Sequence, residues 1–89
     1  MLTKEEILSL IENKAKSYGA KKVVIFGSFI ENQSRYNDID IACDIEGLAL
    51  LEFAGILENE LRIPIDIFPL NENSDFIRSI SSRGKILYE

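Results

Sequence analysis

Three aspartates carry the chemistry that can be read from this 89-residue chain. Asp38 and Asp40 stand in "NDIDIACD", and Asp66 stands among apolar residues in "IPIDIFP". Side chains of a strand repeat every two residues, so Asp38 and Asp40 should point the same way, about 7 Å apart along the backbone. Like charges so placed repel each other unless a cation lies between them. If the strand of Asp66 pairs beside theirs, the three carboxylates would suit Mg²⁺ or Mn²⁺, which prefer oxygen ligands.

A plainer interpretation of the same aspartates stays open. Asp38 and Asp40 could form the solvent side of an amphipathic strand, and Asp66 could be a solvent-facing residue of an edge strand. Against this stands the poor strand propensity of aspartate, which makes two in one strand locally unfavourable unless they serve a function.

The Gly27–Ser28 pair follows the apolar run "VVIF". Glycine allows backbone angles that other residues avoid, so the chain can approach a ligand closely there. Ser28 offers a hydroxyl and an amide, and if "SFIENQ" begins a helix, its N–H groups predict a phosphate site. A tight turn with Ser28 as a helix N-cap explains the pair equally well.

Composition excludes several classes of function. The chain has no histidine, which removes Ser-His and Cys-His catalysis and imidazole zinc ligands. The single cysteine, Cys43, excludes an internal disulfide framework. The net charge of −5 argues against direct DNA binding. The apolar runs are shorter than the ~18–20 residues of a membrane span, and "MLTKEEILSL" lacks the pattern of a signal peptide. We therefore expect a cytoplasmic protein.

Periodicity predicts one domain over residues 1–89, with an α/β (α+β) fold: a small mixed β-sheet with helices packed on it. Thr3 and Glu6 fit a capping box, and Gly19 suits the end of that helix. The expected elements are helix 3–18, strand 21–26, strand 38–45, helix 48–62, strand 63–69, helix 74–82 and edge strand 85–89.

For helix 48–62 the pattern predicts a core stripe and a second apolar set outside it. The outer set, which could form a docking patch for another protein, comprises Leu48, Phe53 and Ile56. The predicted core stripe comprises Leu50, Leu51, Ala54, Leu57 and Leu61.

Together, "GS" after a strand, "DIDI" in the next strand and a later "IDIF" resemble the nucleotidyltransferase superfamily that includes the beta-type DNA polymerases. The "VVIFGS" entry and the "RGKILYE" ending resemble its minimal branch, the MNT antitoxins of HEPN-domain ribonuclease toxins. The resemblance implies a polymerase beta-like fold, ATP as substrate, Mg²⁺ or Mn²⁺ as cofactor and a hetero-oligomer with a HEPN toxin. It also implies that AMP is transferred to a toxin hydroxyl, a tyrosine in this branch.

Carried over to this chain, the resemblance places the triphosphate on Gly27 and Ser28 and two metal ions on Asp38 and Asp40. Asp66 would join one ion and help to deprotonate the attacking hydroxyl.

Several positions depart from the family pattern. Asn32 replaces a glycine, and Phe29 and Ile30 replace basic residues after the serine. Arg35 could restore one phosphate contact, although it also fits an exposed loop arginine. These departures leave two alternatives open: an active transferase, or an antitoxin with a weakened site that acts by binding alone. A phosphatase of the Asp-x-Asp-x-Thr/Val kind fits less well, because Ala42 occupies the Thr/Val position.

Overall fold

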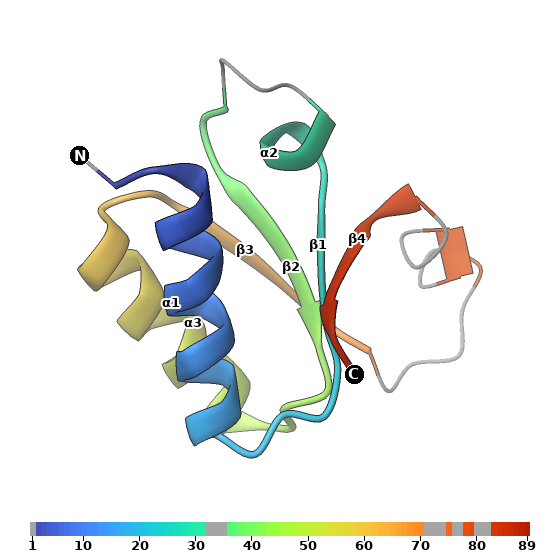
Figure 1. Cartoon of the computed structure of the whole chain (residues 1–89). Coiled ribbons are helices and arrows are strands. Elements are labelled where there is room, and N and C mark those ends of the chain that lie inside the picture. Colours follow the sequence, from blue (N-terminus) through green and yellow to red (C-terminus); the bar gives the residue numbers. More distant parts are fainter. Residues whose placement is uncertain (1, 32–35, 71–74, 76–77, 80–82) are drawn as a thin grey trace.

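The computed structural model describes residues 2–31, 36–70, 75, 78–79 and 83–89. The described elements follow the predicted order, with a short additional helix, α2, between the first two strands (Figure 1). The elements are α1 Lys4–Ser17, β1 Val23–Phe26, α2 Ser28–Glu31, β2 Ile39–Cys43, α3 Leu48–Leu61, β3 Ile65–Pro69 and β4 Lys85–Tyr88.

The strands form one four-stranded sheet in the order β3-β2-β1-β4. β1 is antiparallel to both β2 and β4, whereas β2 and β3 are parallel and are joined through α3. The sheet is therefore mixed, as predicted, and residues 85–88 form the expected edge strand.

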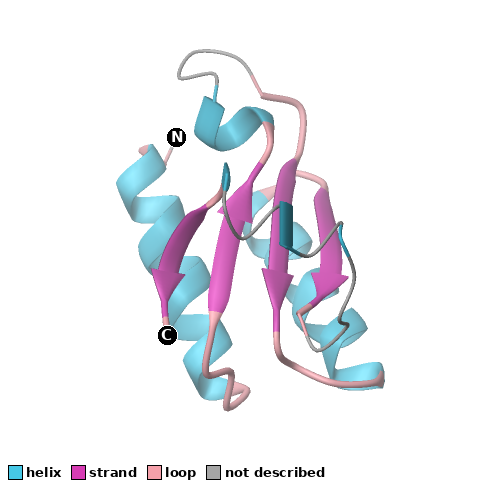
Figure 2. Ribbon diagram, turned by 90° about the vertical axis from the view of Figure 1, so that its right-hand side faces the viewer, coloured by secondary structure: helices cyan, strands magenta, loops and turns pink. Residues whose placement is uncertain are grey.

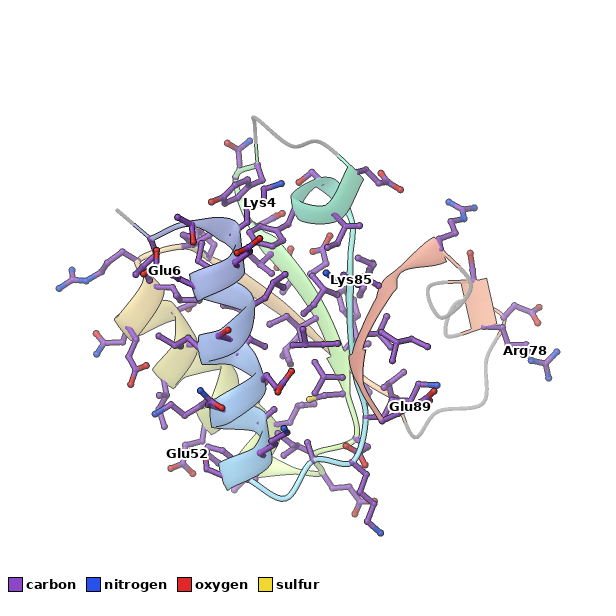
Figure 3. The ribbon with its side chains drawn as sticks, viewed as in Figure 1. Lys4, Glu6, Glu52, Arg78, Lys85 and Glu89 are labelled. Atoms are coloured by element: carbon purple, nitrogen blue, oxygen red, sulfur yellow. The ribbon has the colours of Figure 1, made fainter. Side chains whose placement is uncertain are left out.

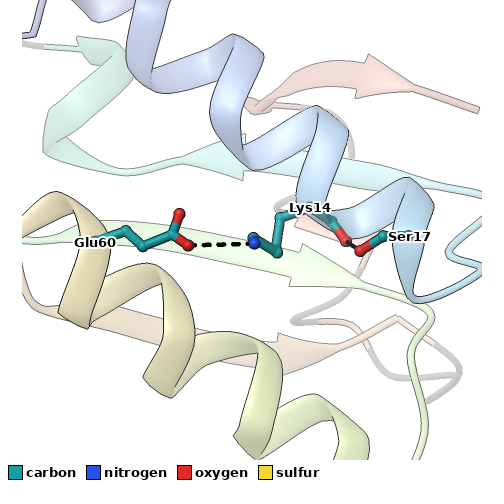
Figure 4. A network of polar contacts seen from close by, with 3 residues as sticks. All are labelled: Lys14, Ser17 and Glu60. Atoms are coloured by element: carbon teal, nitrogen blue, oxygen red, sulfur yellow. Dashed lines mark hydrogen bonds and ion pairs between the residues drawn. The ribbon is translucent and has the colours of Figure 1, made fainter.

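Helices α1 and α3 cover one face of the sheet, as Figures 1 and 2 show from two sides. The alternation of β2 is the predicted one, with Ile39, Ile41 and Cys43 facing these helices in the main core. Lys14 of α1 forms an ion pair with Glu60 of α3 at 3.2 Å, and the Ser17 hydroxyl donates to the Lys14 carbonyl at 2.6 Å (Figure 4). The two helices are thus joined by packing and by a surface ion pair.

The capping box predicted for α1 is confirmed. The Glu6 backbone N–H donates to the Thr3 hydroxyl at 3.1 Å, and the Thr3 N–H donates to the Glu6 carboxylate at 2.9 Å. These bonds fix the first turn of α1 and therefore the position of Lys4, its first helical residue.

The core face of α3 differs from the prediction at two residues. Leu51, predicted to be inside, is 62% exposed, and Phe53, predicted to be outside, is fully buried and meets the Tyr18 ring edge-on at 5.7 Å between centroids. Each residue turns a helix by about 100°, so Leu51 lies a quarter turn or more from the centre of the buried face. The buried set is Leu50, Phe53, Ala54, Leu57 and Leu61.

The opposite face of the sheet carries a smaller apolar cluster, in which Val24 and Ala42 are buried beneath Phe26, Phe68 and Leu70. The Phe26 and Phe68 rings lie 5.4 Å apart. The predicted helix 74–82 falls largely outside the described residues, so the structure leaves that prediction open. Among the helices that the structure describes, none combines the length and apolar character needed to cross a membrane.

Candidate metal and nucleotide site

The sheet topology brings the predicted site residues to one end of the sheet. β1 runs antiparallel to β2, so the end of β1 lies next to the start of β2, with Phe26 paired to Asp40. β3 runs parallel to β2 in a register that pairs Asp40 with Asp66. Gly27 follows β1 and Asp38 precedes β2, so both lie at this same end.

The carboxylates of Asp38, Asp40 and Asp66 converge. Each offers one oxygen, and these three oxygens all lie within 4.8 Å of one another. In register, β3 places Asp66 directly opposite Asp40. Asp38 and Asp40 are half-buried, whereas Asp66 is exposed, so the cluster is open on the side of β3. This is the arrangement that the sequence predicts for a shared cation.

Burial and repulsion between carboxylates raise the pKa of two members of the cluster, Asp38 and Asp40. Burial raises the pKa of Asp38, and the hydrogen bond and charge of Asp66 add to the effect. Burial, the charge of Asp38, and the hydrogen bond and charge of Asp66 raise the pKa of Asp40 to about 6. A divalent cation between these carboxylates would stabilise their ionised forms and so compete with protons.

The donor set fits a hard divalent cation. All three donors are carboxylate oxygens, the ligands of Mg²⁺ and Mn²⁺. Three carboxylate oxygens within 4.8 Å of one another are close enough to share one such ion after small side-chain movements. The open side leaves room for water and phosphate oxygens as further ligands.

Gly27 sits directly beside Asp40. Its φ of +78° lies in the left-handed region, and a Cβ built there would be 3.0 Å from the Asp40 Cγ and would collide with its carboxylate. Glycine is therefore needed here for two separate reasons, the backbone angle and the space that Asp40 occupies.

Ser28 begins α2, a single turn in which the N–H groups of Ile30 and Glu31 donate to the Gly27 carbonyl at 3.1 and 3.0 Å. The structure thus brings Gly27 and Ser28 to the same end of the sheet as the three aspartates. Arg35 and Asn32 lie outside the described residues, so their predicted places are not tested.

Cys43 ends β2 and Asp44 follows it, and neither belongs to the carboxylate cluster. The Asp44 carboxylate accepts hydrogen bonds from the backbone N–H groups of Lys21 and Lys22, which the sequence did not reveal. Cys43 is buried, and burial raises the pKa of its thiol to about 11, which removes it as a nucleophile at neutral pH. A shallow hollow on the outer side of α1 and α3 is lined by Leu2, Leu10 and Glu60 and contains none of the aspartates.

Residues 5–89 match the protein family described as Polymerase beta, Nucleotidyltransferase, and the chain belongs to this family. The resemblance drawn from "GS", "DIDI" and "IDIF" is thereby confirmed. A comparison with curated proteins gave no match.

Solved structures of similar fold come from toxin–antitoxin complexes. One is a toxin–antitoxin complex with AMP-PNP, 24% identical with a TM-score of 0.77, covering 91% of this chain and 72% of that chain. A second is the MntA–HepT complex, 21% identical with a TM-score of 0.71, covering 92% and 69%. A third is a tri-AMPylated Shewanella oneidensis HEPN toxin in complex with MNT antitoxin, 22% identical with a TM-score of 0.77, covering 97% and 72%. These likenesses establish the predicted fold.

Proposed function

We propose that this protein is a Mg²⁺-dependent nucleotidyltransferase that moves AMP from ATP to a hydroxyl of a partner HEPN toxin, in the cytoplasm, and so acts as its antitoxin. The acceptor is a tyrosine by resemblance to the MNT branch. The observation that carries the proposal is the convergence of Asp38, Asp40 and Asp66 within 4.8 Å, next to the Gly27–Ser28 turn.

In the proposed step the acceptor oxygen forms a bond to the α-phosphorus of ATP. The bond from that phosphorus to the oxygen bridging the β-phosphate breaks, so AMP joins the acceptor and pyrophosphate leaves. Asp66 would take the proton of the acceptor hydroxyl, and its exposure on the open side of the cluster supports this role. Asp38 and Asp40 would hold the divalent ions, which polarise the phosphate oxygens and stabilise the leaving pyrophosphate.

Two of the similar structures support the substrate and the product. One contains AMP-PNP, an ATP analogue, and another contains a tri-AMPylated HEPN toxin. Since this chain shares their fold and carries the acid cluster, we extend nucleotide use and AMP transfer from those proteins to this one.

The test is a transfer assay with purified protein, ATP, Mg²⁺ and the HEPN protein encoded by a neighbouring gene. We expect the partner to gain the mass of one AMP for each transfer and to lose ribonuclease activity. Asp66→Asn should abolish this gain, while Asp75→Asn, an isosteric change at an exposed aspartate, should leave it unchanged. A partner that binds the wild-type protein but keeps its mass contradicts the transferase proposal.

A second candidate function, neutralisation by docking alone, is favoured by one observation on α3. Leu48 is 83% exposed and Leu51 62%, one helical turn apart, so two large apolar side chains face solvent together. Gly55 follows at the next turn, where a side chain would meet open space, so nothing inside the described structure requires a glycine. A flat apolar stripe of this kind fits a partner surface that approaches α3 closely.

Two sets of variants separate the candidates. Under the transferase proposal, Asp38→Asn with Asp40→Asn abolishes neutralisation while binding is retained; under the docking proposal, that double variant neutralises fully. Leu48→Ser with Leu51→Ser should weaken toxin binding at least about tenfold if the stripe is the interface. Leu2→Ser, at an exposed leucine elsewhere, is the matched control.

A further inference from the structure

We infer that Lys4 is a positioning residue for the nucleotide site: it clamps together the two chain segments that enter and leave that site. The inference rests on the proposed function and adds to it a residue of α1, an element that supplies none of the predicted site residues.

The Lys4 ammonium makes three contacts at the end of α1 that lies next to α2 (Figure 3). It donates a hydrogen bond to the Phe29 carbonyl at 2.6 Å. It also lies 4.8 Å from the centre of the Phe29 ring and 5.2 Å from that of the Tyr36 ring. The two rings meet edge-to-face, 4.7 Å apart between centroids. One cation therefore contacts a backbone carbonyl and two aromatic rings that already pack together.

These partners have a particular place in the chain. Phe29 directly follows the Gly27–Ser28 turn, and Tyr36 comes two residues before Asp38. The ammonium of Lys4 thus touches the segment that carries the predicted phosphate contacts and the segment that leads into the acid cluster. Holding both at once fixes the distance between the turn and the carboxylates before any nucleotide binds.

Local helix energetics would not select this lysine. The N-terminus of a helix carries partial positive charge, so a cation in the first turn of α1 is unfavourable there. Glu5 and Glu6, the next residues, have the favoured sign. The contacts of Lys4 with α2 and Tyr36 supply a reason for its position that the helix itself does not. A hydrogen bond from a charged donor and cation–π contacts are strong enough to offset the misplaced charge.

The main variant is Lys4→Met, which keeps the apolar stem and removes the ammonium. Since the turn is engaged both in the bound substrate and in the transition state, we expect the KM for ATP to rise about tenfold with kcat changed less than about twofold. Backbone amides of residues 28–31 should exchange hydrogen about tenfold faster. Lys4→Arg, which keeps the charge, should restore both measurements to within about threefold of wild type.

Lys16→Met is the matched control. It removes the same charge from the same helix, where Lys16 pairs with Glu12 on the surface at 3.0 Å. It should leave the KM, kcat and exchange at residues 28–31 unchanged. If Lys4→Met also leaves the KM and the exchange rates unchanged, or if Lys4→Arg fails to rescue them, the inference is wrong.

The inference can still be tested if Lys4→Met does not fold or if the wild type transfers no AMP. Should Lys4→Met not fold, Tyr36→Leu removes one of the two rings beside the ammonium and should raise the KM about threefold. Should the wild type transfer no AMP, the proposed function fails on its own, and amide exchange in wild type and Lys4→Met still decides whether Lys4 holds the turn.

Discussion

Two aspartates at opposite ends of β2 have opposite surroundings. Beyond the end of the strand, Asp44 accepts N–H groups from Lys21 at 2.8 and 3.0 Å and from Lys22 at 3.2 Å, so the fold itself supplies donors for its carboxylate. Near the start of the strand, Asp40 faces two further carboxylates, and its pKa is raised to about 6. A carboxylate that accepts backbone hydrogen bonds stabilises the fold. A carboxylate that faces other carboxylates lowers stability at neutral pH, and a bound cation would offset this loss.

The strongest test of this comparison is the same isosteric change, aspartate to asparagine, at Asp40 and at Asp44. Asp40→Asn should reduce AMP transfer more than about 100-fold, because removing a direct ligand costs more than the 10–100-fold seen for supporting groups. Asp44→Asn, which keeps an accepting oxygen, should stay within about threefold of wild type. Initial rates of partner modification give both values, and equal losses would refute the division of roles.

Two glycines, Gly19 toward the Asp44 end of β2 and Gly27 toward the Asp40 end, allow a second paired test. Gly19 and Gly27 have nearly the same φ, +79° and +78°, but a Cβ meets open space at Gly19 and the Asp40 carboxylate at Gly27. Both alanine variants should lose about 1–2 kcal/mol of stability from the backbone angle. Gly27→Ala should in addition slow transfer about 10- to 100-fold, because it displaces a reacting-site carboxylate. Melting curves and rates separate the two effects, and similar rates for the two variants would count against a role for the Gly27–Asp40 contact.

Divalent cations should stabilise the Asp40 end in a pH-dependent way. At pH 7.5, Mn²⁺ at about ten times its Kd should add about 1.4 kcal/mol, or roughly 5–10 °C in Tm. Below pH 6 a proton on Asp40 competes with the ion, so the shift should shrink by pH 5. Thermal melts with Mn²⁺ or a chelator test this; Asp40→Asn should abolish the shift and Asp44→Asn should keep it.

The smallest expected effect concerns stability without metal. Variants at Asp40 and Asp44 should change the free energy of unfolding in opposite directions. The folded pKa of Asp40 is raised above its ordinary value of 3.8 to about 6, so its contribution to stability is present below pH 3.8 and is lost as pH rises through 6. Asp40→Asn should therefore raise stability at pH 7.5 by about 1 kcal/mol after solvent screening, and by nearly nothing at pH 4. Asp44→Ala should lower stability by about 1 kcal/mol, since it removes a cap-like acceptor. Denaturant melts in a chelating buffer compare them, and destabilisation by both variants at pH 7.5 would contradict the contrast.

The sequence was informative where its signal is local or periodic. The two-residue repeat places Asp38 and Asp40 on one side of a strand, and the capping box of Thr3 and Glu6 specifies where α1 begins. The pairing of the Asp66 strand with the strand of Asp38 and Asp40 is not contained in any local pattern. It was expected from the resemblance to the nucleotidyltransferases. The catalytic roles of these residues remain predictions.

Other features could not be read from the chain. Residues 48–57 are nearly all apolar, so several faces of α3 fit a core stripe, and the choice between Leu51 and Phe53 depends on the neighbouring sheet and α1. The contact of Lys4 with Phe29 joins residues 25 positions apart, and its one local signal is a cation at the unfavourable end of a helix.

The register that pairs Asp40 with Asp66 places two proposed metal ligands on adjacent strands. An ion shared by these residues would fasten β3, at the margin of the sheet, to the interior strand β2, across the whole loop that α3 forms. Removing the ion with a chelator would then loosen β3 first, and proteases would cleave magnesium-free molecules faster than magnesium-bound ones. Under the proposed function, activity and resistance to proteolysis would then both depend on the same bound ion.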